Sequence, residues 1–108
     1  MYIDQFTDYL RLERNYSPRT VNSYRRDLVL FRQFLAETDS ELDLLTADRD
    51  VVRLWVVEMM EHHQTSTTVN RKLSTLRSFY KFLRMKGITD KSPVQGIKGP
   101  SLDRKSVV

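Results

Sequence analysis

Glycine and proline, the residues that most often interrupt regular structure, each occur only three times in this 108-residue chain. Before Gly87 the sole residue of either type is Pro18, so the chain contains long uninterrupted segments. Within these segments apolar residues recur at steps of three and four, which is the period of an α-helix. The pattern predicts an all-α fold rather than a set of short strands.

Four segments show this helical period. They are residues 2–14, a segment that starts at 17 and ends before a loop at 37–45, a segment that starts at 46–48, and residues 66–87. The second begins at Ser17-Pro18, which suits a helix N-terminus because serine caps free backbone N–H groups and proline has none to leave unpaired. Four amphipathic helices with short connections predict a compact bundle at residues 1–97. Residues 98–108 are poor in apolar side chains, and we interpret them as a linker.

Several kinds of site are excluded by the residue types present. The chain has no cysteine, and its two histidines are neighbours, which point about 100° apart on a helix and make a poor metal pair. We find no glycine-rich phosphate loop and no residue set for a nucleophilic triad. No apolar run approaches the roughly 20 residues that a membrane span requires. We therefore expect no metal, cofactor, catalytic residue or membrane contact, and a cytoplasmic protein.

The fourth segment carries the clearest candidate for an interaction surface. Between Thr65 and Thr89 the chain has no acidic residue, although its net charge is only +4. One side of the segment is a polar ribbon, spaced by four and three, of Asn70, Ser74, Arg77, Lys81 and Arg84. Helix faces in water usually mix charges, because pairs of opposite charge stabilise the helix. A ribbon without carboxylates suits DNA, whose phosphates and base edges bind arginine, lysine and asparagine.

The second segment has a similar surface near its start. One polar side is formed by Arg19, Asn22 and Arg26, and the opposite flank by Arg25 and Arg32. The end capped by Ser17 adds free N–H groups and the positive end of the helix dipole, which bind phosphate. We interpret the two surfaces as parts of one clamp that faces the same groove of a DNA duplex.

Two stretches resemble the N-terminal domain of Xer-type and phage integrase-type tyrosine recombinases. SPRTVNSYRRDL at residues 17–28 is similar to the opening of that domain, and TVNRKLSTLRSFYKFL at residues 68–83 to its last long helix. Ser92-Pro93-Val94 and residues 97–100 resemble the family's exit into its interdomain linker. The similarity covers about residues 6–100, and the two motifs stand in the family's order and at its separation.

The resemblance implies a core-binding domain with a SAM-like, orthogonal four-helix bundle. In that family this domain holds double-stranded DNA from one side, with its second and fourth helices towards the major groove, while a catalytic C-terminal domain holds the other side. The candidate DNA contacts carried over are Ser17, Arg19, Thr20, Asn22, Arg25, Arg26, Asn70, Arg71, Ser74, Arg77 and Lys81, with Lys98, Arg104 and Lys105 in the linker. The family's catalytic residues belong to the C-terminal domain, so none of the tyrosines here is expected to be a nucleophile.

The family also sets expectations for the whole protein. We expect a strand-exchanging tyrosine recombinase, associated with the nucleoid, that uses no cofactor and acts as a tetramer on paired DNA sites. The isolated domain is expected to be monomeric. Two alternatives stay open: a stand-alone helical DNA-binding regulator, and a protein-interaction bundle whose basic face docks an acidic partner. Val29 and Leu30 point away from the second segment's main apolar stripe and would serve a protein contact.

Overall fold

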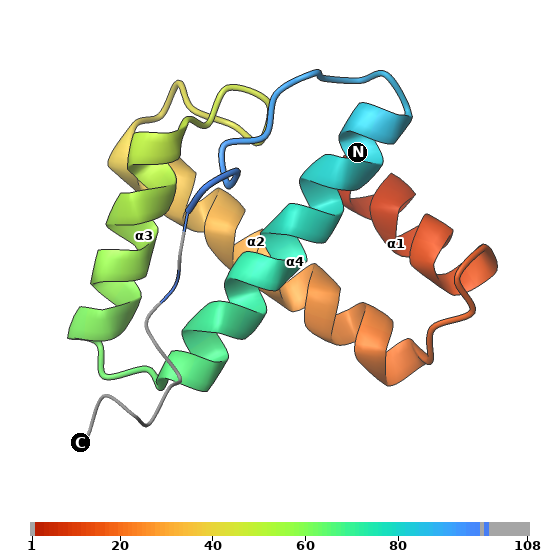
Figure 1. Cartoon of the computed structure of the whole chain (residues 1–108), viewed down its shortest axis with the longest axis horizontal. Coiled ribbons are helices and arrows are strands. Elements are labelled where there is room, and N and C mark those ends of the chain that lie inside the picture. The colour runs from red at the N-terminus through yellow and green to blue at the C-terminus, as the bar shows by residue number, and fades with distance from the viewer. Residues whose placement is uncertain (1, 98, 100–108) are drawn as a thin grey trace.

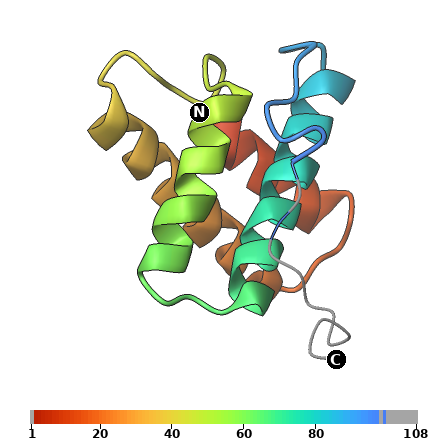
Figure 2. The ribbon, with the colours of Figure 1, turned by 60° about the vertical axis from the view of Figure 1, so that its left-hand side comes forward.

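Four helices make up most of the computed structural model, which describes residues 2–97 and 99. The helices are α1 (Tyr2–Leu12), α2 (Pro18–Thr38), α3 (Arg49–Glu61) and α4 (Ser66–Met85), and the described residues contain no strand. In Figure 1, α4 crosses in front of α2, with α1 and α3 on either side of the crossing. Figure 2 shows α3 and α4 side by side with α2 behind them. The predicted all-α, SAM-like four-helix fold is confirmed.

Three of the helices begin at a capping side chain. Ser17, Asp48 and Thr65 each have an extended backbone and accept a hydrogen bond from the N–H group three residues further on. This confirms the predicted start at Ser17-Pro18. The third helix begins at Arg49, one residue after the predicted start at 46–48, with Asp48 as its cap. Asp50 lies in the first turn of α3, where a carboxylate suits the positive end of the helix dipole.

The helix ends differ slightly from the prediction. α1 ends two residues before residue 14, and the backbone then turns at Asn15, whose φ is +55°. α4 ends at Met85, and Gly87 follows with a φ of +74°, a conformation that glycine adopts without a steric penalty. α2 continues to Thr38, two residues into the predicted loop, because Asp39 N–H still donates to the Leu35 carbonyl oxygen.

α4, like α2, packs against all three other helices. Its buried side chains are Val69, Lys72, Leu73, Thr75, Leu76, Phe79, Tyr80, Phe82 and Leu83. Phe6 of α1 contacts the rings of Phe79 and Phe82, each at a centroid distance of 5.5 Å. On the other side of the core, Phe31 of α2 packs on Trp55 of α3 at 4.9 Å. Apolar packing therefore covers one broad side of α4 and leaves the opposite side outside the core.

Residues 88–97, here called the strap, return along α4 after the helix ends (Figure 2). Val94 and Ile97 are buried, and turn hydrogen bonds join Gln95 N–H to the Ser92 carbonyl and Ile97 N–H to that of Val94. The sequence predicts irregular chain here and gives no indication that it joins the core. Lys98 and residues 100–108, most of the predicted linker, lie outside the described residues.

Replacing Tyr80 by phenylalanine tests how the loop before α3 is attached to α4. The buried Tyr80 hydroxyl donates to the Leu44 carbonyl oxygen at 2.6 Å, and burial raises the pKa of this phenol. Tyr80→Phe should lower the free energy of unfolding by about 1–2 kcal/mol, because a buried carbonyl loses its donor. Urea denaturation of both proteins measures this. Tyr2→Phe is the control, and equal losses in the two variants would contradict the assignment.

Candidate nucleic-acid interface

The two helices that carry the candidate surfaces, α2 and α4, are joined at a buried carboxylate. Asp27 of α2 is 1% exposed, and its Oδ1 accepts a hydrogen bond from Arg71 Nη2 at 3.0 Å. Its Oδ2 accepts from Thr75 Oγ1, also at 3.0 Å. A carboxylate removed from water costs several kcal/mol unless charge and hydrogen bonds compensate for the lost hydration. Arg71 and Thr75 supply that compensation and join the start of α4 to the middle of α2.

Lys72, on the next position of α4, belongs to the core side of the helix. It is 8% exposed, and its Nζ donates to Gln64 Oε1 at 3.0 Å. Burial lowers the pKa of this ammonium group, while the nearby Asp27 charge opposes the shift. Lys72 adds to the positive charge of α4, but it is therefore unavailable to a ligand on the outer face of the helix.

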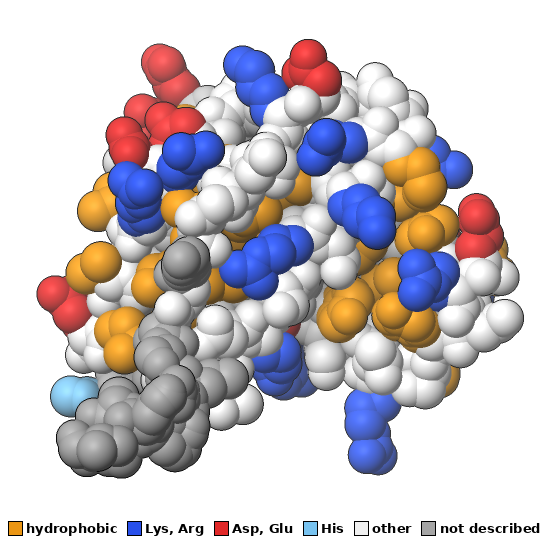
Figure 3. All heavy atoms as spheres, in the orientation of Figure 1, with side chains coloured by type: hydrophobic (Ala, Val, Ile, Leu, Met, Phe, Trp, Pro, Cys, Tyr) orange, Lys and Arg blue, Asp and Glu red, His pale blue; other side chains and the backbone are white. Residues whose placement is uncertain are grey.

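The outer side of α4 carries the predicted ribbon. Ser74, Arg77, Lys81 and Arg84 are exposed, whereas Asn70 is half-buried and donates from Nδ2 to the Ser66 carbonyl oxygen at 2.9 Å. In Figure 3, lysine and arginine side chains spread over the face on which α4 lies, and acidic side chains lie towards its margin. The structure thus brings the ribbon together on one face that is positive at its centre.

The start of α2 is polar and open to solvent. Ser17, Arg19, Thr20, Asn22 and Arg26 are all exposed. Ser17 Oγ accepts from Thr20 N–H at 3.3 Å and lies 3.0 Å from Thr20 Oγ1, so the cap is formed in the absence of a ligand. Arg26 is the residue before Asp27, so this surface extends along α2 to the turn that is joined to α4.

Arg25 lies on a different side of α2 from the other predicted contacts. Its Nη1 is 2.6 Å from Asp4 Oδ1, and its Nη2 donates to Thr7 Oγ1 at 2.9 Å, so the guanidinium group is held against α1. The Arg25 hydrogen bond lowers the pKa of the Asp4 carboxyl. Arg25 and Arg71 are both paired with carboxylates, and their proposed role as DNA contacts stays a prediction.

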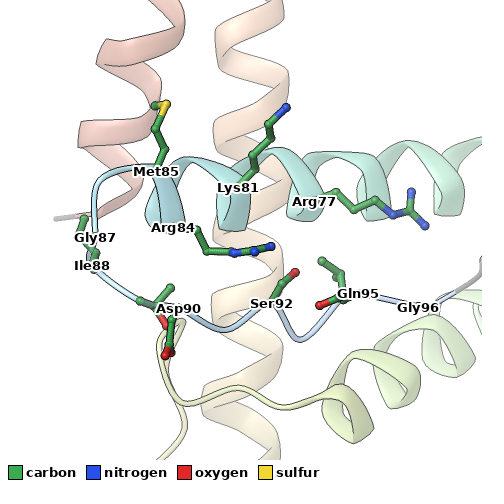
Figure 4. A pocket seen from close by; sticks show the side chains of 12 residues that line it. Arg77, Lys81, Arg84, Met85, Gly87, Ile88, Asp90, Ser92, Gln95 and Gly96 are labelled. Carbon is green, nitrogen blue, oxygen red and sulfur yellow. The ribbon is translucent and has the colours of Figure 1, made fainter.

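A groove separates the C-terminal half of α4 from the strap. Arg77, Lys81 and Arg84 line one wall, and Ser92 and Gln95 belong to the other. Figure 4 shows the Arg84 side chain lying between the helix and the strap, with the Ser92 side chain directed towards it. Arg77 Nη2 donates to the Ile97 carbonyl oxygen at 2.9 Å and so ties the strap to the ribbon.

Sequence reasoning omitted several of these residues from the candidate set. Arg84 lay on the predicted ribbon but was not carried over as a contact. Ser92 belongs to the family-like stretch Ser92-Pro93-Val94 but was not named as a contact, and Gln95 belongs to no recognisable pattern. Asp27 had a detectable signal, because an acidic residue three after Tyr24 and four before Phe31 lies on the apolar stripe of its helix. The predicted linker contacts Lys98, Arg104 and Lys105 fall outside the described residues.

The described residues contain no group of three or more acidic or histidine side chains arranged to hold a metal ion. None of the four helices is long and apolar enough to cross a membrane.

Comparison with known proteins assigns the fold to a family. The family model for the phage integrase N-terminal SAM-like domain matches residues 3–87. The chain belongs to this family. A tyrosine recombinase XerC from Pediococcus pentosaceus is 40% identical over 93 residues, which cover 86% of the chain and 31% of the relative. A XerD from Rickettsia bellii is 36% identical over 105 residues, or 96% of the chain and 33% of the relative. No solved structure matches.

A third relative, a tyrosine recombinase from Pseudothermotoga lettingae, is 37% identical over 109 aligned positions that cover 95% of the chain and 36% of the relative. The chain therefore spans about a third of the length of the curated relatives that it matches. The matches confirm the predicted resemblance to recombinases of the Xer and phage integrase type. The matched residues include both polar helix surfaces, whereas the strap follows them in the chain.

Arg71→Ala tests whether the pair at the helix crossing supports the fold. The substitution leaves the buried Asp27 carboxylate with the Thr75 hydroxyl as its sole hydrogen-bond donor among the described residues. We expect a loss of about 1–3 kcal/mol in the free energy of unfolding, measured by urea denaturation. Arg84→Ala removes the same charge from the exposed side of α4 and should change stability by about 0.5 kcal/mol or less. If the two variants lost similar amounts of unfolding free energy, the Arg71–Asp27 pair would have no specific role in stability.

Proposed function

We propose that this domain binds double-stranded DNA as the N-terminal half of a clamp in a site-specific tyrosine recombinase. The observation that carries the proposal is the α4 ribbon, a helix face with several exposed cations and no carboxylate; the start of α2 offers a second exposed polar surface. Membership of the phage integrase SAM-like family supports it, and so do the recombinases that are similar to the chain. The contribution of this domain is affinity and positioning rather than bond cleavage.

The two surfaces suit different parts of a DNA site. Ser17 and the free N–H groups at the start of α2 favour a phosphate, because the helix dipole and the donors point the same way. Arg19, Asn22 and Arg26 on α2 and Ser74 and Lys81 on α4 have side chains that donate to phosphates or to base edges in the major groove. We propose that binding through these residues depends on the DNA sequence.

We propose further that the whole protein breaks and rejoins DNA strands with catalytic residues outside this domain. By the same reasoning, four copies act on paired DNA sites, and this domain alone is a monomer. Leu30 of α2 is 37% exposed and is a candidate contact between copies. A domain that contacts on the order of four to six phosphates should lose affinity with a log–log salt slope of about −4 to −5.

Arg26→Ala tests duplex binding at the α2 surface. The variant should bind a DNA duplex more weakly and with a salt slope smaller in magnitude by about 0.9, because one phosphate contact is lost. Fluorescence anisotropy over a range of salt concentrations measures both. Arg32→Ala is the matched control, since it removes the same charge from the opposite flank of the same helix and should leave both values unchanged.

Three outcomes would refute the proposal. They are unchanged binding by Arg26→Ala, equal effects in the two variants, and equal affinity for duplex DNA and poly-glutamate. The last of these would favour an acidic protein partner. The Arg77→Ala variant is less informative here, because Arg77 also holds the strap through Ile97.

A further inference from the structure

The groove between α4 and the strap has a composition that neither the ribbon nor the start of α2 shares. Its lining includes Arg77, Lys81 and Arg84 of α4, while the strap contributes neutral polar side chains, among them Ser92 and Gln95, and one carboxylate. Short hydroxyl and amide side chains commonly bind phosphate and sugar oxygens beside arginine and lysine. The groove therefore combines two kinds of phosphate-binding group on facing walls.

The strap wall is held in place before any ligand arrives. Val94 is 1% exposed and Ile97 is 5% exposed, so both anchor the strap in the apolar core. The Arg77 hydrogen bond to the Ile97 carbonyl fixes one end, and the hydrogen bond between Gln95 N–H and the Ser92 carbonyl shapes the middle. A ligand in the groove meets preformed partners, which lowers the entropy lost on binding.

The cations that line the groove follow one another along α4, with Arg84 between the helix and the strap and Lys81 extending away from the strap (Figure 4). Arg77, Lys81 and Arg84 are seven residues apart from first to last, which corresponds to about 10 Å along the helix axis. The carboxylate in the lining, Asp90, points away from Arg84 in Figure 4, and no ion pair joins it to the described cations. A row of cations of this length matches a polymer of phosphates better than a single anion, because one DNA strand carries a phosphate every ~3.4 Å of its axis.

We infer that this groove binds the phosphodiester backbone of one DNA strand, as a second contact separate from the start of α2. The inference rests on the proposed DNA binding, gives Arg84 of the ribbon a specific role and adds Ser92 and Gln95 of the strap. The contacts are to phosphates and sugars, so this groove adds affinity at any sequence and leaves base recognition to the other surfaces. It also makes the strap part of the DNA-binding surface rather than a mere connection.

The first test compares two charge-neutralising variants at the end of α4. Arg84→Gln keeps a long polar side chain in the groove but removes its charge, and it should reduce the magnitude of the salt slope of duplex binding by about 0.9. Lys86→Gln removes the same charge two residues later, outside the groove lining, where the Nζ lies over the Phe82 ring. It should leave the slope unchanged. Equal slopes in Arg84→Gln and the unmodified protein would overturn the inference.

The second test locates the contact by NMR on the whole 108-residue chain. Backbone amides of Ser92 and Gln95 should shift on titration with a DNA duplex, along the same saturation curve as those of Thr20 and Asn22. If the α2 amides shift and the strap amides do not, the groove inference fails while DNA binding stands. If neither set shifts, the proposed function fails as well.

Two further titrations identify the chemistry of the ligand. Inorganic phosphate and poly-glutamate should each require a much higher anion concentration than the duplex to shift the strap amides. If inorganic phosphate saturates these amides at a concentration similar to that of DNA phosphates, the groove is a site for a free anion and the inference is wrong. The same result with poly-glutamate would assign the groove to an acidic protein instead.

Discussion

The burial of α4 against three other helices constrains every other part of this domain. Nine of its side chains face the core, including Phe79 and Leu73, and this requires most of the helix circumference. The face that is left is narrow and runs the length of the helix. Polar residues on that face lie in one row because the same helical period that places the apolar residues inside places the others outside. The helical period of α4 thus determines both which residues pack in the core and which are exposed to a ligand.

The positive charge of the domain divides into two groups with different roles. Arg25 and Arg71 are paired with the carboxylates of Asp4 and Asp27, and Lys72 is mostly buried. These cations hold α1, α2 and α4 together, and their charge is partly neutralised by the protein itself. Arg26, Lys81 and Arg84 have no ion pair with any described residue and remain available to an external anion. A count of arginine and lysine in the sequence does not separate the two groups.

Helix order, helix starts and the apolar stripes were predictable from sequence because they depend on local patterns. Ser17-Pro18 marks the start of α2 correctly, and the stripe through Leu73 and Leu83 marks the buried side of α4. The partners of charged residues depend on segments far apart in the chain, such as the 44 positions between Asp27 and Arg71, and no local pattern encodes them. The strap was missed for a related reason. Its anchors Val94 and Ile97 are two isolated apolar residues without a repeating period.

Gly99, the last residue that the structure describes, lies against the first half of α4. A Cβ atom at this position would stand 2.8 Å from Asn70 Cγ and 3.0 Å from Leu73 Cδ1, so any other residue would require these two side chains to move. Ile97 is anchored in the core two positions earlier. A larger residue in place of Gly99 would therefore push on Asn70, the first member of the polar ribbon, and on Leu73 in the core, so the size of this one side chain affects both the outer and the inner face of α4.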